Sequence, residues 1–94
     1  MKTITIQIGN TDDKLTQEEW ASFVGTISAL LEDSNASIHF FGAPPNYERW
    51  QNAAWVFVAE DWISEQAVKS EVVDIRKLFK QSYLAWTEGV TEFI

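Results

Sequence analysis

Apolar and polar residues alternate strictly over Thr3–Ile8, which places Ile4, Ile6 and Ile8 on one face of an extended chain. This period of two predicts a strand with one buried face. The most apolar run in the chain is Trp50–Ala59, and its β-branched and aromatic side chains favour extended backbone. We expect this run to form a central strand, covered on most of both faces.

Two other segments have the spacing of amphipathic helices. The first opens with a capping box, Thr16 followed by Glu19, and continues with one apolar stripe made of Trp20, Phe23, Val24, Ile27, Leu30 and Leu31. The second is signalled after Glu60-Asp61 by Ser64, and its apolar positions are Val68, Val72, Ile75 and Phe79. Basic residues at its end, Arg76, Lys77 and Lys80, complement the helix dipole.

Two shorter strands complete the pattern. We expect one at Ser37–Phe41, with Ile38 and Phe40 facing the core, and another at Tyr83–Trp86, closed by Glu88-Gly89. The order βαββαβ predicts a single α+β domain over residues 1–94 with a ferredoxin-like fold. Right-handed crossovers give an antiparallel four-stranded sheet in the order 4-1-3-2, with both helices on one face.

Composition narrows the class of protein. With 46% hydrophobic and 22% charged residues the chain should be globular, and without cysteine it has no disulfide and no thiolate. A reducing, cytoplasmic setting fits, because no run approaches the ~20 apolar residues that span a bilayer and no signal peptide opens the chain. The net charge of −7 disfavours nucleic-acid binding. We interpret the dispersed acids as solubilising, and an acidic surface that mimics DNA is the alternative.

Three polar loops should meet at one end of this fold and form a site for a small polar ligand or a protein partner. The expected site residues are Asn10, Asp12, Asp13, Tyr47, Arg49, Trp50, Gln51, Asn52, Lys80, Gln81 and Ser82. Their amides, guanidinium, hydroxyls and aromatic faces suit that kind of ligand. The alternative is that Asn10 and Asn52 cap turns, Trp50 packs, and Arg49 pairs with a carboxylate in solvent.

The sheet face without helices is a second candidate surface. We expect it to present Thr5, Gln7, His39, Phe41 and Tyr83, with either Trp55 and Phe57 or Ala54 and Val56. Exposed aromatic residues on an open sheet mark a partner site. Dimerisation through this face, or cover by Phe93-Ile94, is the expectation, against the alternative of a face masked by long side chains.

No catalytic motif stands out. Asp12 and Asp13 are adjacent carboxylates without a third ligand at a diagnostic spacing, and His39 has no predictable partner. We therefore predict no catalytic residue, metal site or cofactor. The alternative is a small enzyme for a nucleotide-like or other anionic substrate, using Asp12 or Asp13 with Arg49 and Lys80.

Three stretches, Thr5–Trp20, Trp50–Trp55 and Gln81–Phe93, resemble a family of small uncharacterised proteins encoded by actinobacteria and their phages. The resemblance implies no activity. It implies a phage or mobile-element accessory protein that acts in the host cytoplasm and blocks a host defence, by binding a protein or by sequestering a nucleotide signal. The leading hypothesis is therefore a non-enzymatic binding protein that forms a homodimer.

Overall fold

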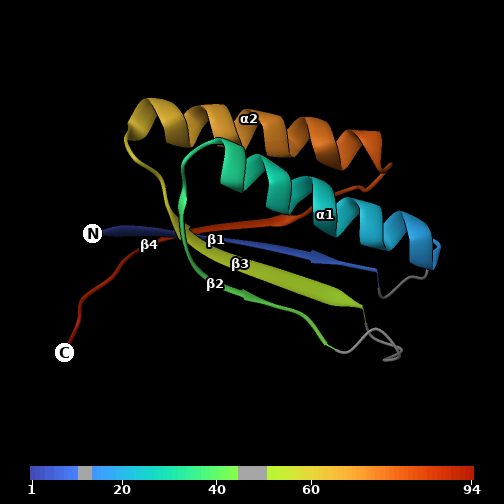
Figure 1. Ribbon diagram of the computed structural model, residues 1–94, viewed down its shortest axis with the longest axis horizontal. Helices are drawn as coiled ribbons and strands as arrows, with labels where there is room; N and C mark the ends of the chain where they lie inside the picture. Colours follow the sequence, from blue (N-terminus) through green and yellow to red (C-terminus); the bar gives the residue numbers. More distant parts are fainter. Residues whose placement is uncertain (11–13, 45–50) are drawn as a thin grey trace.

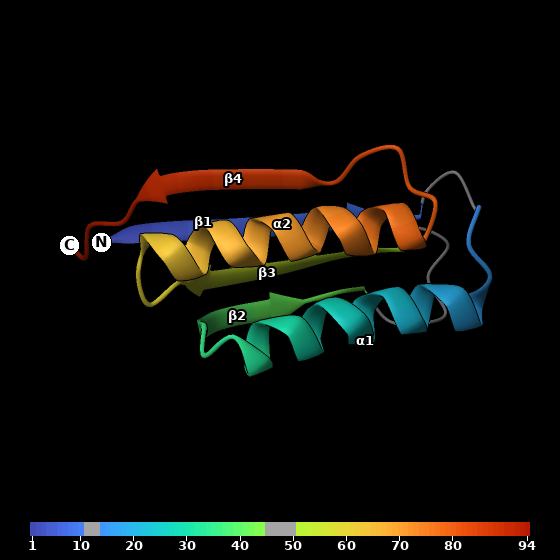
Figure 2. The same cartoon turned by 90° about the horizontal axis from the view of Figure 1, so that it is seen from above.

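The computed structural model describes residues 1–10, 14–44 and 51–94. The elements are β1 (Lys2–Gly9), α1 (Gln17–Asp33), β2 (Ser37–Gly42), β3 (Asn52–Val58), α2 (Trp62–Leu78) and β4 (Ala85–Val90). All neighbouring strands are antiparallel, and their order across the sheet is β2-β3-β1-β4. Both helices cover the same face (Figure 1), with α2 over the middle strands and α1 toward β2 (Figure 2). The predicted ferredoxin-like βαββαβ fold and strand order are confirmed.

The core lies between the two middle strands and the helices. β1 and β3 pair in a register that sets Ile6 opposite Trp55, and their alternate residues are buried beneath the helices. β3 is an interior strand as predicted, but only one of its faces is buried, because Ala54, Val56 and Val58 are half-exposed. The expectation of cover on both faces was therefore wrong. Trp50, where that strand was expected to begin, lies outside the described residues.

Helix α1 begins as the sequence predicts. The Glu19 N–H donates to the Thr16 hydroxyl at 3.1 Å, and the Thr16 N–H donates to the Glu19 carboxylate at 3.0 Å, which completes the capping box. Its stripe buries Trp20, Phe23, Ile27 and Leu31, while Val24 and Leu30 are half-buried.

Helix α2 begins one turn earlier than its expected cap. Asp61 is the N-cap instead of Ser64, and the Asp61 carboxylate accepts the Ser64 N–H at 2.7 Å. Ser64 thus lies in the first turn of the helix, where its backbone N–H has no acceptor within the helix. The last turn carries Arg76 and Lys77 as predicted, and Phe79 stacks on Phe23 with ring centroids 4.9 Å apart.

The predicted faces of β2 are partly reversed by a register shift between Ile38 and Phe40. Ile38 lies opposite Phe57, but Phe40 lies opposite Val56 and Phe41 opposite Trp55. Since directly opposed residues share a face, Phe41 lies on the helix side, 5.2 Å from the Trp55 ring, and Phe40 lies on the open side. The prediction that Phe40 is in the core and Phe41 on the open face was wrong, because His39 adds a residue to the strand.

β4 starts later and ends later than expected. It runs from Ala85 to Val90, so Tyr83 precedes the strand and Glu88-Gly89 lie within it. Arg76 Nη1 donates to the carbonyls of Gln81 and Ser82, both at 2.9 Å, and these bonds keep the connection from α2 away from the ladder. Past the strand, Phe93 is 81% exposed, so Phe93-Ile94 does not cover the open face.

Candidate functional site

The predicted loop residues fall into two groups. Asp12, Asp13, Tyr47, Arg49 and Trp50 lie outside the described residues, as do the contacts that they would make. The other six, at the end of the molecule where β1 ends and β3 begins (Figure 1), are Asn10, Gln51, Asn52, Lys80, Gln81 and Ser82. The fold thus brings the described parts of the three loops to one end, as their topology predicts.

Two of these polar residues are buried instead of facing a ligand. Asn10 is 2% exposed, and its Nδ2 donates to the Leu15 carbonyl at 3.0 Å and to Gln51 Oε1 at 2.8 Å. The Leu15 N–H donates back to Asn10 Oδ1 at 3.0 Å, and Gln51 Nε2 donates to Gln17 Oε1 at 2.7 Å. The amides of Asn10 and Gln51 therefore fasten the β1–α1 connection to the start of β3. Because their side-chain amides are buried and hydrogen-bonded, Asn10 and Gln51 do not face a ligand at this end of the molecule.

Asn52 is the exposed first residue of β3, opposite Gly9. The other three predicted residues, Lys80, Gln81 and Ser82, belong to the connection between α2 and β4. Lys80 has a positive φ of 57°, which turns the chain after the helix, and Gln81 Nε2 donates to the Phe79 carbonyl at 3.1 Å. With the Arg76 bonds to Gln81 and Ser82, these contacts hold the connection in one shape. Arg76 was expected only to complement the helix dipole, and its reach to the next loop has no signal in the sequence.

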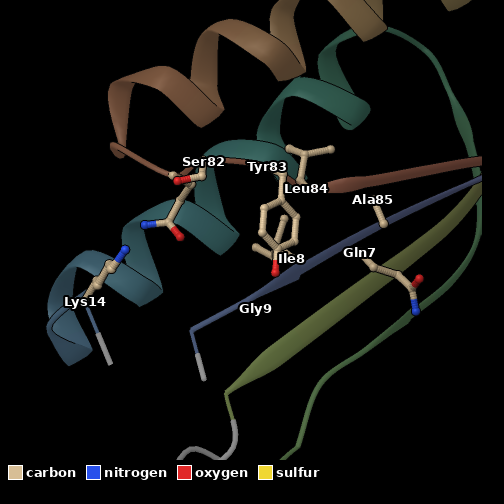
Figure 3. Close-up of a pocket in the computed structure, with 9 residues that line it drawn as sticks. Gln7, Ile8, Gly9, Lys14, Ser82, Tyr83, Leu84 and Ala85 are labelled. Carbon is tan, nitrogen blue, oxygen red and sulfur yellow. The ribbon is translucent and has the colours of Figure 1, made fainter. Parts of the chain in front are cut away.

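A pocket of about 430 Å³ lies between this connection and the end of β1 (Figure 3). Of the predicted site, Gln81 and Ser82 line it, together with Gln7, Ile8, Gly9, Lys14, Tyr83, Leu84 and Ala85. We call it the loop-end pocket. Lys14, which precedes α1, reaches toward the pocket, and the Tyr83 ring extends from the opposite wall toward β1 (Figure 3). Sequence reasoning missed the β1 wall, because strand residues were assigned to the sheet.

Backbone groups of β1 are directed into this pocket. The Asn10 N–H donates to the Gln51 carbonyl at 2.8 Å, toward β3. Since successive strand residues direct their N–H and C=O groups to opposite edges, those of Gly9 point toward the β4 side. The β1–β4 ladder ends at the pair Gln7–Ala85, so Gly9 has no ladder partner there. The pocket therefore offers a backbone donor and acceptor beside an ammonium group and two hydroxyls.

The face of the sheet opposite the helices is a second site, and register identifies its residues. We define the open face as the strand positions opposite those buried under the helices. They are Thr3, Thr5, Gln7 and Gly9 of β1 and Asn52, Ala54, Val56 and Val58 of β3. The outer strands add Ala85, Thr87 and Gly89 of β4, and Ser37, Phe40 and Gly42 of β2. The Ala54 and Val56 alternative of the sequence analysis is the one observed, and Phe41 does not belong to this face.

A buried carboxylate lies at the other end of the sheet, on the helix side. Glu65 of α2 is 4% exposed and pairs with Lys2 Nζ at 2.7 Å, while Lys2 also lies 3.4 Å from Glu88. The hydrogen bond to Glu65 raises the pKa of Lys2. The Trp86 indole N–H, which donates to Glu88 at 3.1 Å, is the main cause that lowers the pKa of Glu88. This cluster fastens β1 and β4 to α2, and the sequence gives no sign of it.

Within the described residues, no three His, Cys, Asp or Glu side chains converge in a way that would hold a metal ion. In the same part of the chain, neither helix is both long and apolar enough to cross a bilayer.

Comparison with known proteins shows the fold alone. No family model matches the sequence, and no curated protein matches it. The structure is similar to the de novo designed protein Foldit4, with a TM-score of 0.63 and 12% identity over 97% of this chain and 96% of that one.

Two bacterial enzymes also contain a similar fold. These are formyltetrahydrofolate deformylases from Pseudomonas putida KT2440 (TM-score 0.58, 9% identity) and Burkholderia mallei ATCC 23344 (TM-score 0.55, 16% identity). The matches include 96% and 94% of this chain but only 28% and 27% of the two enzymes. The chain therefore spans little more than a quarter of their length, and identities this low establish only the shared ferredoxin-like architecture.

Proposed function

We propose that this chain is a small non-enzymatic binding protein that holds a small polar, nucleotide-like ligand in the loop-end pocket and acts as a homodimer. The observation that carries the proposal is the backbone edge of Gly9, left without a ladder partner inside a pocket of about 430 Å³. Pockets for small ligands typically measure about 300–1,000 Å³ and combine an apolar wall with a few polar groups. The loop-end pocket lies within this range of volumes, and its lining mixes apolar side chains with polar ones.

The lining groups suggest how such a ligand is held. The Gly9 N–H and the Lys14 ammonium suit an anionic or acceptor group, and the Ser82 hydroxyl can donate or accept. The Tyr83 ring is 84% exposed in the free protein, so its face is open to a planar group such as a base. Gln81 and Arg76 keep the Ser82–Tyr83 wall in place, which lowers the cost of ordering it on binding.

Holding a ligand fits this lining better than converting it. The described residues around the pocket include no carboxylate, imidazole or thiol, and its titratable side chains, Lys14 and Tyr83, suit an anionic group and a planar ring as parts of a ligand. A small enzyme that uses Asp12 or Asp13 with Arg49 and Lys80 is the alternative, and of these residues Lys80 alone belongs to the described part. It predicts that the ligand is consumed and that Asp13→Ala abolishes turnover without unfolding the protein.

The biological setting that we propose is a phage or mobile-element accessory protein that blocks a host defence. Its support is the resemblance of Thr5–Trp20, Trp50–Trp55 and Gln81–Phe93 to proteins of actinobacteria and their phages. Sequestering a nucleotide signal is the form of blockade that agrees with the loop-end pocket. Blockade by binding a host protein would instead leave that pocket empty.

A nuclear magnetic resonance titration tests the proposed site. Backbone amide shifts are followed while AMP, GMP, CMP or UMP is added to the full chain. We expect shifts centred on Gly9, Lys14 and Ser82 for at least one nucleotide, and an affinity at least about tenfold weaker for Ser82→Phe, which fills the pocket from an exposed position. Ser70→Phe, an equal change on the exposed surface of α2, is the matched control.

Three outcomes contradict the site. One is that Ser82→Phe binds as tightly as the unchanged protein. Another is that shifts cluster on open-face positions that do not line the pocket, and the third is that none of the four nucleotides moves a resonance. The same samples show whether the nucleotide is consumed, which separates binding from the enzyme alternative.

A further inference from the structure

We infer that the open face is the interface between two copies of this chain. This inference deepens the proposed function, because it identifies the surface through which the homodimer forms. It rests on where the charges lie, on the shape of the face and on its area.

The strands of the sheet carry very few charged residues. The four strands carry two charged residues, Lys2 and Glu88, and these pair with each other on the helix side. The described strand positions of the open face are uncharged, although the chain has 21 charged residues in all. A solvated surface of a chain with this composition would be expected to carry its share. An uncharged face of this extent is typical of a surface that another surface covers.

A second copy is the occupant that this charge distribution favours. The chain has a net charge of −7, so two copies repel each other wherever their acidic surfaces meet. Packing open face on open face puts the two helical layers, which bear most of the described charges, on the outside. Nucleic acid or an acidic partner would need basic groups on this face, and a basic partner would need acidic ones. Neither is present on its described strand positions.

The shape of the face suits close packing of two sheets. A row of directly opposed residues crosses all four strands: Phe40, Val56, Thr5 and Thr87. The Phe40 ring lies over Gly42, where a Cβ would collide with it, so this aromatic side chain lies along the sheet instead of standing up from it. The other members of the row are short. Two such faces can approach to the spacing of about 10 Å seen between stacked sheets.

The area is sufficient for a specific dimer. Strands about 4.8 Å apart that rise about 3.3 Å per residue give four strands of this length on the order of 500 Å² of face. Two faces then bury on the order of 1,000 Å², which is the lower bound for a biological interface. We therefore expect a reversible dimer and not a permanently associated one.

Sedimentation equilibrium of the full chain tests the inference. We expect a monomer–dimer equilibrium that tightens between about 50 mM and about 500 mM NaCl, because salt screens the repulsion between two −7 chains and the described strand positions of the open face carry no charge that could form an ion pair. Val56→Lys, at the centre of the row, should weaken dimerisation at least about a hundredfold, because it buries an unpaired charge. Thr87→Lys, at an exposed position, should weaken it in the same direction with less risk to the fold.

The matched control is Ser70→Lys, which adds the same charge to the exposed surface of α2 and should leave the dimer intact. A wild-type chain that is monomeric at every salt concentration overturns the inference. So does a dimer that Val56→Lys and Thr87→Lys leave unchanged, which would point to pairing of sheet edges. Gln7 and Ala85 belong both to the open face and to the lining of the loop-end pocket. Nucleotide titration of the Thr87→Lys variant separates the two proposals, because binding at Gly9, Lys14 and Ser82 of the monomer supports the pocket without the dimer.

Discussion

At the scale of single residues, the polar side chains divide into those that hold the loops and those that are open to a ligand. Asn10 and Gln51 are polar residues beside loops, for which solvent exposure is the ordinary expectation. They are nevertheless buried and use their amides on each other and on Leu15. Buried amides must be satisfied in this way, since an unpaired one costs about 1–3 kcal/mol. Their burial could not be predicted, because it depends on how two distant segments meet.

Glu19 gives a prediction about acid stability. The hydrogen bond from the Thr16 backbone N–H lowers the pKa of its carboxyl below the usual 4.5. The charged form therefore stabilises the fold above pH 4.5, and this stabilisation is lost as the pH falls through the lowered value of the folded state. Glu19→Gln should reduce the free energy of unfolding more at about pH 7 than at about pH 3. Urea unfolding at both values measures this, and an equal loss at the two would contradict it.

At the scale of elements, features that depend on near neighbours in the sequence were predicted. Features that depend on contacts between different elements, such as the register of β2, were not. Alternation of Ile4, Ile6 and Ile8 predicts β1, and Thr16 with Glu19 predicts the start of α1, because each depends only on near neighbours. The register shift at His39 depends on β3 and has no sequence signature of its own. The connection that precedes β4 is likewise bonded to Arg76, which lies on a different element.

The register shift in β2 can be tested with two neighbouring aromatic residues. Phe41 contacts the buried Trp55 on the helix side, and Phe40 lies on the open face. Phe41→Ala should therefore lower the free energy of unfolding by roughly 1–2 kcal/mol more than Phe40→Ala. Both are measured by urea unfolding in the Thr87→Lys background, so that dimerisation does not contribute. A larger loss for Phe40→Ala would restore the face assignment expected from simple alternation.

At the scale of the whole molecule, the topology was predictable and the candidate site only in part. Strand order and the placement of helices follow from connection rules once six elements are recognised. Those rules correctly bring the described parts of three loops to one end, with Gln81 and Ser82 lining a pocket there. The connection rules do not predict that the β1–β4 ladder stops before Gly9. Nor do they predict that the described strand positions of the open face are uncharged.

Native mass spectrometry of the protein purified from its host lysate tests ligand binding and dimerisation together, since one spectrum reports both the oligomer and any retained small molecule. We expect a dimer that carries a reproducible adduct, which disappears in Ser82→Phe and persists in Ser70→Phe. A bare monomer that instead captures one host protein would overturn both proposals and leave a protein-blocking role in place of ligand binding.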